Sequence, residues 1–251
     1  MLANQMRQGI SDGMAEFLAV DIWRGAAEGQ FERFAVPRSD NQTVLDVVTH
    51  VQKVLEPSLA YRFACRVGMC GSCAMMVNGK ARWTCRTHVK KVAADGRLTL
   101  EPLANLPRIR DLVADLAPFF DKWQGAGGQF KPQERLGEDF AIVPPSSAAR
   151  QQADEAIECI GCAACYASCD VVASQADYLG PAALNRAWTL MNDVRDGARE
   201  DRLKAVSGAG GCQNCHTQQG CRDACPKGLN PTRSIAGLKR MSLKALIGGR
   251  L

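Results

Sequence analysis

Cys65-Arg-Val-Gly-Met-Cys70-Gly-Ser-Cys73 is the stretch of the chain that decides the fold, and a fourth cysteine follows at Cys85. Thiols this close together converge on one point, as the ligands of a metal or a metal cluster do. Gly68 and Gly71 permit the dihedral angles with which a loop turns its backbone N–H groups toward bound anionic sulfur. The stretch therefore predicts a loop folded around a metal centre.

The spacing of these cysteines indicates the kind of centre. C-x4-C-x2-C, followed by eleven residues and a last cysteine, is the plant-type ferredoxin pattern, in which four thiolates hold a [2Fe–2S] cluster. Structural zinc is the alternative, because four cysteines also make a zinc site. Zinc sites usually come as two C-x2-C pairs, so the longer gap favours the cluster. The predicted ligands are Cys65, Cys70, Cys73 and Cys85.

The sequence on either side of this loop is rich in strand signals. Strands are expected at residues 16–23, 31–36, 74–77, 80–84 and 97–100. Asn78-Gly79 predicts a hairpin, and apolar residues at helical spacing predict a helix over residues 43–55. A further helix over residues 111–123 is expected as a connector. Together these elements indicate a β-grasp domain over residues 16–123.

The composition is that of a globular protein, with 251 residues, 46% hydrophobic residues, 23% charged residues and a net charge of +5. The longest apolar stretches fall far short of the ~20 residues of a membrane span, and residues 1–13 contain no apolar run of the kind an export signal needs. Disulfide scaffolds belong to short secreted chains. Twelve cysteines in this chain therefore indicate ligands rather than disulfides.

A polar stretch rich in glycine and proline, residues 124–147, is the expected linker between two domains. Beyond it the strand signals largely disappear, and helices are predicted at residues 148–158, 181–192, 197–206 and 231–246. The chain is expected to be α+β: an N-terminal extension of residues 1–15, the β-grasp domain, the linker, and an all-helical domain of residues 148–251.

Two further cysteine runs lie in the helical part. Cys159-x2-Cys162-x2-Cys165-x3-Cys169 has the bacterial ferredoxin spacing, and the run from Cys215 to Cys225 repeats it with Gln218 in place of its second cysteine. In two-cluster ferredoxins the fourth cysteine of each run ligates the other cluster. This crossover predicts a [4Fe–4S] site formed by Cys159, Cys162, Cys165 and Cys225. The other site has three thiolates, which favours [3Fe–4S]: Cys169, Cys215 and Cys221.

Cys212 stands three residues before Cys215 and could supply a fourth thiolate. A spare buried thiol is the favoured interpretation, because the ferredoxin pattern is complete without it. The sequence has no GxGxxG motif after a strand and no P-loop. Three clusters without a flavin or nicotinamide site predict an electron carrier that receives electrons from one partner and passes them to another.

Five segments of the chain resemble the iron–sulfur subunit of succinate dehydrogenase and fumarate reductase, over about residues 16–239. They are Ser58–Asn78, Pro107–Val113, Cys159–Cys169, Tyr178-Leu-Gly-Pro-Ala-Ala183, and Cys225-Pro-Lys-Gly-Leu-Asn-Pro-Thr232. The resemblance implies a subunit that relays electrons between an FAD-containing subunit, which interconverts succinate and fumarate, and quinone at an integral membrane anchor. It also implies that His216, after the first three-iron ligand, lies near the quinone.

The expected location is the cytoplasmic side of the inner cell membrane, as a peripheral protein. From Pro226 onward the chain has six basic residues and no acid, which suits an anionic leaflet or an acidic anchor surface; a solubilising helix end is the alternative. Nucleic-acid binding is not expected. Two alternatives remain for the whole chain: an iron–sulfur subunit of another flavoprotein dehydrogenase, and a zinc-binding interaction protein.

Overall fold

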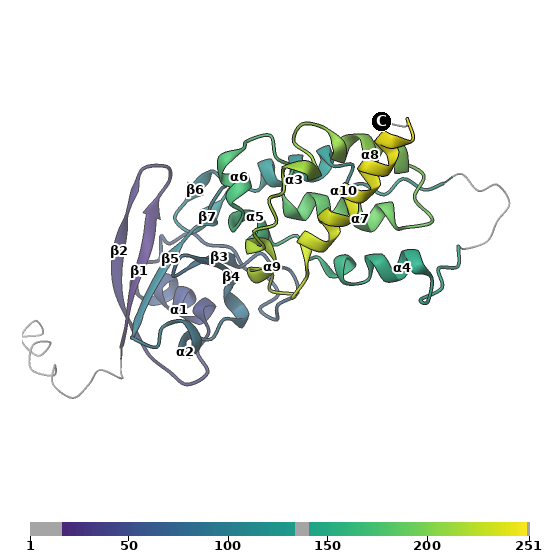
Figure 1. Ribbon diagram of the computed structural model, residues 1–251. Helices are drawn as coiled ribbons and strands as arrows, with labels where there is room; N and C mark the ends of the chain where they lie inside the picture. Colours follow the sequence, from purple (N-terminus) through teal and green to yellow (C-terminus); the bar gives the residue numbers. More distant parts are fainter. Residues whose placement is uncertain (1–16, 134–140, 250–251) are drawn as a thin grey trace, which may run out of the picture. The chain divides into compact units, whose positions relative to one another are not determined.

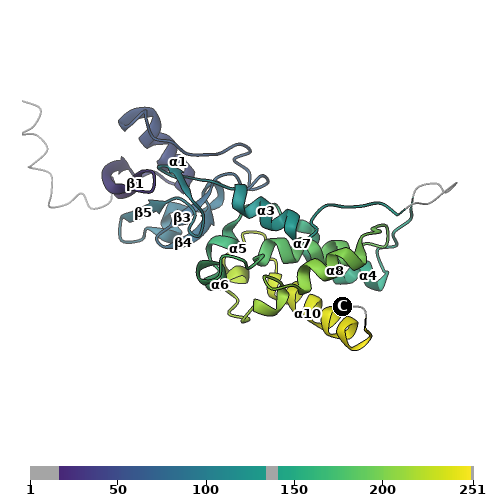
Figure 2. The ribbon, with the colours of Figure 1, turned by 90° about the horizontal axis from the view of Figure 1, so that it is seen from above.

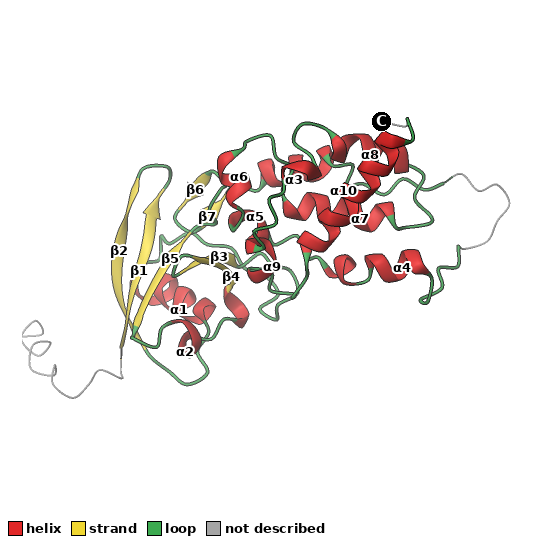
Figure 3. Cartoon of the chain, viewed as in Figure 1, coloured by secondary structure: helices red, strands yellow, loops and turns green. Residues whose placement is uncertain are grey.

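A computed structural model describes residues 17–133 and 141–249. The chain divides into two compact units, Met1–Ala114 and Asp115–Leu251, which are called here the first unit and the second unit (Figure 1). Strands belong to the first unit, and the second unit is built of helices and loops (Figure 3). In the described ranges, no helix combines the length and the apolar character needed to cross a lipid bilayer.

A five-stranded mixed sheet forms the first unit, in the order β2-β1-β5-β3-β4. β1 is antiparallel to β2 and parallel to β5, whereas β3 is antiparallel to both β4 and β5. The strands are β1 (Phe17–Gly25), β2 (Gly29–Pro37), β3 (Ala74–Val77), β4 (Lys80–Trp83) and β5 (Arg97–Glu101). All five predicted strands are present, and Asn78 and Gly79 form the turn of the predicted hairpin with positive φ angles.

The core of the first unit lies between this sheet and α1 (Val44–His50). Alternate residues of β1 point inward, so Leu18, Val20 and Ile22 are fully buried. Thr43 and Asp46 form a reciprocal capping box at the start of α1. The helix continues into a wider π-helical turn, Val51–Leu55, and the short α2 (Val89–Val92) lies further along the chain. The predicted helix over residues 43–55 is thus confirmed.

The predicted helix over residues 111–123 is wrong in its first half. Asp111 has a φ of +49°, and its buried carboxylate accepts hydrogen bonds from the N–H groups of Gly25 at 3.0 Å and Ala60 at 2.8 Å. A small ladder of β6 (Arg108–Arg110) and β7 (Val113–Ala114) surrounds it. These long-range bonds replace the helical ones. Helix α3 (Ala117–Gly125) begins only in the second unit.

The second unit is centred on two helices, α7 (Pro181–Met191) and α10 (Pro231–Ile247), which pack against each other. Gly237 makes this contact possible, because a Cβ there would lie 2.3 Å from the ring of Trp188. Phe119 of α3 packs edge-on against Tyr166, with 5.6 Å between ring centroids. The remaining α-helices are α4 (Ala148–Ala153), α5 (Ala164–Ala167), α6 (Asp170–Ser174), α8 (Arg199–Ser207) and α9 (Gly220–Asp223).

The first part of the expected linker is packed within the second unit. Arg202 of α8, only 1% exposed, forms a buried ion pair with Asp196 at 2.6 Å. Its guanidinium also donates to the carbonyls of Gly127 at 2.8 Å and Gln129 at 3.0 Å. These bonds satisfy a buried charge that would otherwise be costly. Residues 134–140 of the expected linker, and the N-terminal extension, lie outside the described residues.

Candidate metal centres

The loop that begins at Cys65 turns its backbone toward sulfur. Arg66, Gly68 and Gly71 have positive φ angles of +58°, +75° and +70°. The N–H groups of Met69 and Cys70 donate to the Cys65 sulfur at 3.2 and 3.3 Å. Hydrogen bonds from the N–H groups of residues 70, 67 and 69 lower the pKa of the Cys65 thiol to about 6. The loop thus stabilises a thiolate, which is the form that binds metal.

The other thiols of this group lie around the same loop. Cys73 and Cys85 are buried beside Leu45, and Cys70 is exposed, with its sulfur 3.0 Å from the Ser72 hydroxyl. Burial, with the neighbouring Cys73, raises the pKa of the Cys85 thiol to about 11. Cys65 also influences that pKa, and Cys65 and Cys70 are hydrogen-bonded to each other. The structure therefore brings the four predicted residues of this loop together.

The first unit contains every residue of this group, so a fragment of residues 1–114 should bind a [2Fe–2S] cluster on its own. The fragment ends where the compact unit ends, not at the end of the predicted connector helix. Anaerobic reconstitution, followed by visible absorption and electron paramagnetic resonance, measures the cluster. Cys73→Ser in the same fragment is the control and should not assemble it. A fragment that is folded by circular dichroism yet stays colourless would contradict the prediction.

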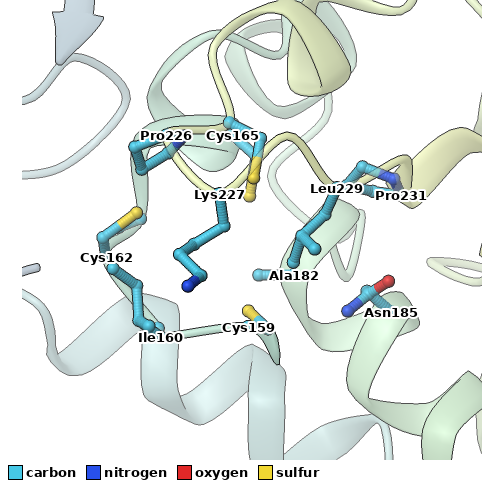
Figure 4. Close-up of a pocket in the computed structure, with 13 residues that line it drawn as sticks. Cys159, Ile160, Cys162, Cys165, Ala182, Asn185, Pro226, Lys227, Leu229 and Pro231 are labelled. Atoms are coloured by element: carbon cyan, nitrogen blue, oxygen red, sulfur yellow. The ribbon is translucent and has the colours of Figure 1, made fainter. Parts of the chain in front are cut away.

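A pocket in the second unit is lined by cysteines from two separate runs. Cys159, Cys162 and Cys165 come from the first run, and Cys225 comes from the second. Figure 4 shows the first three, with Lys227 among them. The remaining lining is largely apolar, including Ile160, Ala182, Leu229 and Pro231. Burial raises the pKa of the Cys162 thiol to about 11 and that of the Cys165 thiol well above its usual value. Anionic sulfur here therefore needs bound metal or nearby cations.

The remaining three predicted ligands form a second group. Cys169, Cys215 and Cys221 lie close enough that the charge of each acts on its neighbours. Tyr178 lies among them and is 1% exposed. Burial and the three nearby sulfurs raise the pKa of its hydroxyl, which also hydrogen-bonds Cys215. Cys165 and Cys221 interact as well, so the two groups of the second unit are neighbours.

The two runs have the same backbone conformation. In both, the second and fourth residues after the first cysteine are left-handed, with φ of +64°, +60°, +61° and +65° at Gly161, Ala163, Thr217 and Gln219. A short helix, α5 or α9, begins at the next residue. Left-handed backbone is unfavourable for residues other than glycine, so its recurrence reflects a shared loop structure. Gln218 therefore occupies the position that Cys162 has in the first run.

Cys212 is buried and precedes the loop that begins at Cys215. Its sulfur lies 3.7 Å from the hydroxyl of Ser242 on α10, which in turn lies 2.6 Å from the Ser207 hydroxyl. Burial raises the pKa of its thiol. Lys239 donates to the Cys215 carbonyl at 2.8 Å nearby, whereas His216 is exposed.

The three groups fit iron–sulfur clusters by their chemistry. The twelve cysteines are present as thiols and not as disulfides, and soft thiolates are the ligands such clusters need. In the described ranges, no three Cys, His, Asp or Glu side chains are placed to hold a single metal ion. A cluster does not need such a set, because a cubane gives each thiolate its own iron and a [2Fe–2S] cluster gives two thiolates to each iron.

These features define a class of protein, the iron–sulfur proteins that carry two ferredoxin-type modules in one chain. Residues 19–121 match the family model of the 2Fe-2S iron-sulfur cluster binding domain, and residues 155–229 match that of the 4Fe-4S dicluster domain. The chain belongs to the family of iron–sulfur subunits of succinate dehydrogenase and fumarate reductase, which are electron-transfer subunits.

Two curated relatives and one solved structure show this. The mitochondrial succinate dehydrogenase [ubiquinone] iron–sulfur subunit 1 of Oryza sativa subsp. japonica is 36% identical over 203 residues, 80% of this chain and 72% of the relative. The fumarate reductase iron–sulfur subunit of Haemophilus influenzae is 31% identical over 220 residues, 83% and 84% of the two chains. A chain of the Mycobacterium smegmatis Sdh1 complex in the apo form superposes with a TM-score of 0.82 at 26% identity, over 92% of this chain and 97% of that one.

Two residues at these centres were not predicted from the sequence. Lys227 lines the four-cysteine pocket, and Tyr178 lies among the other three thiols. Both belong to segments that the family resemblance had singled out, Cys225–Thr232 and Tyr178–Ala183. The position of Lys227, two residues after Cys225, was the available signal for it. Tyr178 is nine residues from the nearest cysteine, so only packing brings it to the thiols.

Proposed function

We propose that this chain relays electrons between an FAD-containing subunit that interconverts succinate and fumarate and a quinone at a membrane anchor. The observation that supports this most directly is the pocket lined by Cys159, Cys162, Cys165 and Cys225, because only the ferredoxin crossover brings the last of these to the first three. When bound, the clusters supply one-electron carriers. The chain's own residues hold them, exclude water and adjust their charge environment.

The ligand assignment is part of the proposal. Cys65, Cys70, Cys73 and Cys85 hold [2Fe–2S] in a β-grasp domain, and the pocket cysteines hold [4Fe–4S]. Cys169, Cys215 and Cys221 hold [3Fe–4S], because Gln218 replaces the missing thiolate. The partners are the flavoprotein and the integral anchor, and the protein lies on the cytoplasmic side of the membrane. His216, exposed beside Cys215, is part of the proposal as a residue near the quinone.

The test is purification of the native complex under anaerobic conditions. The chain should co-purify with a flavoprotein that holds FAD, and succinate should bleach part of the visible cluster absorption. The same chain separated from the flavoprotein should not respond to succinate. Clusters that respond to a different substrate of the co-purified flavoprotein, and not to succinate, would show a subunit of another dehydrogenase.

Lys227 should raise the reduction potential of the four-iron site. Its side chain lines the pocket and is 28% exposed, and its ammonium lies 3.7 Å from the carboxylate of Glu158. A positive charge stabilises the reduced cluster, which carries one more negative charge. Unit charges a few ångströms apart interact by a few kcal/mol at a dielectric of about 20, and solvent screening reduces this. We expect Lys227→Met to change the ratio of oxidised to reduced cluster about tenfold, about 59 mV downward for one electron.

Redox titration of the holoprotein, followed by electron paramagnetic resonance, measures this shift. Lys227→Arg retains the charge and should retain the potential. Lys204→Met removes an equal charge from α8, outside the pocket lining, and serves as the matched control. A Lys227→Met protein with an unchanged or higher four-iron potential would contradict the prediction.

A further inference from the structure

A groove on the second unit is lined by three cations from one helix. Arg233, Arg240 and Lys244 of α10 line it together with Gly237, Met241, Trp188 and Gln152. Positions 233, 240 and 244 are seven and four residues apart, so the cations lie along one side of the helix. The cavity volume of the groove is about 280 Å³, close to the lower end of the size range of ligand sites.

Within residues 17–133 and 141–249, the positive charge of this groove is largely unbalanced by carboxylates. Arg233 is 3.7 Å from Glu155, but both side chains are largely exposed, at 65% and 58%, so the pair is weak. No carboxylate in the described part of the chain lies within 4.0 Å of the charged groups of Arg240 or Lys244. Arginine and lysine are the side chains that proteins use to recognise phosphate groups. The groove is therefore complementary to an anionic group.

The surface beside the cations is apolar. Trp188, 6% exposed, contributes to the lining of the groove through its contact with Gly237. Further along the same helix, three large apolar side chains are exposed, at 56%, 62% and 79%: Leu243, Leu246 and Ile247. A row of cations next to exposed apolar residues is typical of helices that lie on membrane surfaces. An acidic protein segment would need the cations but would leave these apolar residues uncovered.

The course of α10 places this surface in the second unit. Pro231, its first residue, lines the four-cysteine pocket, and Lys239 in its middle bonds the carbonyl of Cys215 in the three-thiol group. The exposed apolar residues come after that point in the sequence, in the last two turns of α10. Figure 2 shows the course of this helix. Under the proposed function, on which this step depends, the three-iron site is the one nearest the quinone. The amphipathic C-terminal part of α10 comes directly after Lys239, the residue that contacts this three-thiol group.

We propose that this groove binds the headgroup phosphate of an anionic phospholipid, while Leu243, Leu246 and Ile247 enter the lipid surface. Arg240 and Lys244 bind the phosphate, and Arg233 adds to the positive potential. The site would attach the chain to the leaflet directly, in addition to any contact with the membrane anchor.

Flotation of the full chain, with its clusters reconstituted, on lipid vesicles tests this proposal. The wild type should float with vesicles that contain phosphatidylglycerol in phosphatidylcholine and not with phosphatidylcholine alone. The double variant Arg240→Gln/Lys244→Gln should partition about 25-fold less, at roughly fivefold for each cation. Lys90→Gln/Lys91→Gln, which removes the same charge from exposed positions of α2, is the matched control and should change partition little.

Three outcomes would overturn the proposal: equal loss in both double variants, equal flotation on neutral vesicles, or displacement by inorganic phosphate at matched ionic strength. The first would show unspecific charge attraction, and the last a site for free phosphate. Leu246→Ser should weaken flotation while leaving the cations in place. Cluster signals and binding to the flavoprotein are measured on the same variants, so failure of the lipid site is distinguishable from failure of the proposed function.

Discussion

Replacing Gln218 by cysteine should convert the three-iron site into a four-iron site. Gln218 stands where Cys162 stands in the first run, in a loop whose left-handed residues repeat at the same positions. Its neutral amide is a poor ligand for iron compared with a soft thiolate. The wild type should therefore show the electron paramagnetic resonance signal of an oxidised [3Fe–4S] cluster. Gln218→Cys should lose that signal and gain a second [4Fe–4S] signal on reduction.

A thiolate at residue 218 adds negative charge and should lower the potential of the site. Electron delivery to quinone should slow, while succinate oxidation with an artificial acceptor on the flavin side stays largely unchanged. Gln218→Asn, which keeps a neutral amide, should retain the three-iron signal. Cys212→Ser should leave both clusters intact, because the Cys212 sulfur lies 3.7 Å from the Ser242 hydroxyl in a buried position. A wild type with two four-iron clusters, one of which Cys212→Ser damages, would contradict the three-iron assignment.

Cys225→Ser should damage the [4Fe–4S] cluster, although Cys225 belongs to the run that supplies the three-iron site. Cys225 lines the pocket of Cys159, Cys162 and Cys165. Without it, one iron of the proposed cluster would have no cysteine ligand. Cys169→Ser should instead damage the three-iron site, because Cys169 lies with Cys215 and Cys221. Mutation of residues that only support metal ligands typically lowers metal affinity roughly 10–100-fold. Removal of a direct ligand should lower cluster affinity by more than this.

Iron content and electron paramagnetic resonance of the two holoprotein variants measure these losses. Cys212→Ser serves again as the control for loss of a buried thiol that is not a ligand. The [2Fe–2S] signal should persist in all three proteins, because its four cysteines belong to the first unit. If Cys225→Ser lost the three-iron signal and Cys169→Ser the four-iron signal, each run would hold its own cluster and the crossover would be wrong.

The sequence by itself determined the cysteine runs, the order of the two modules and the family. Cluster ligands lie close together within short loops, and the dihedral angles of those loops select small residues. The patterns in Cys65–Cys73 and Cys159–Cys169 can therefore be recognised without a structure. The five strands of the first unit were also predictable, because alternation along β1 and the Asn78-Gly79 turn are local signals. The position of Cys225 in one pocket with Cys159, Cys162 and Cys165 was predictable as well, from the pattern that the two runs share.

Only the tertiary structure decided what surrounds these local features. Residues 111–116 have helical periodicity, but the buried Asp111 carboxylate binds N–H groups of distant residues and prevents the helix. Residues 126–129 look like a linker, yet the guanidinium of Arg202 binds the carbonyls of Gly127 and Gln129. Tyr178 reaches three thiols from outside any cysteine run. In each case a buried polar group must find partners far away in the sequence, and no short-range pattern encodes where those partners lie.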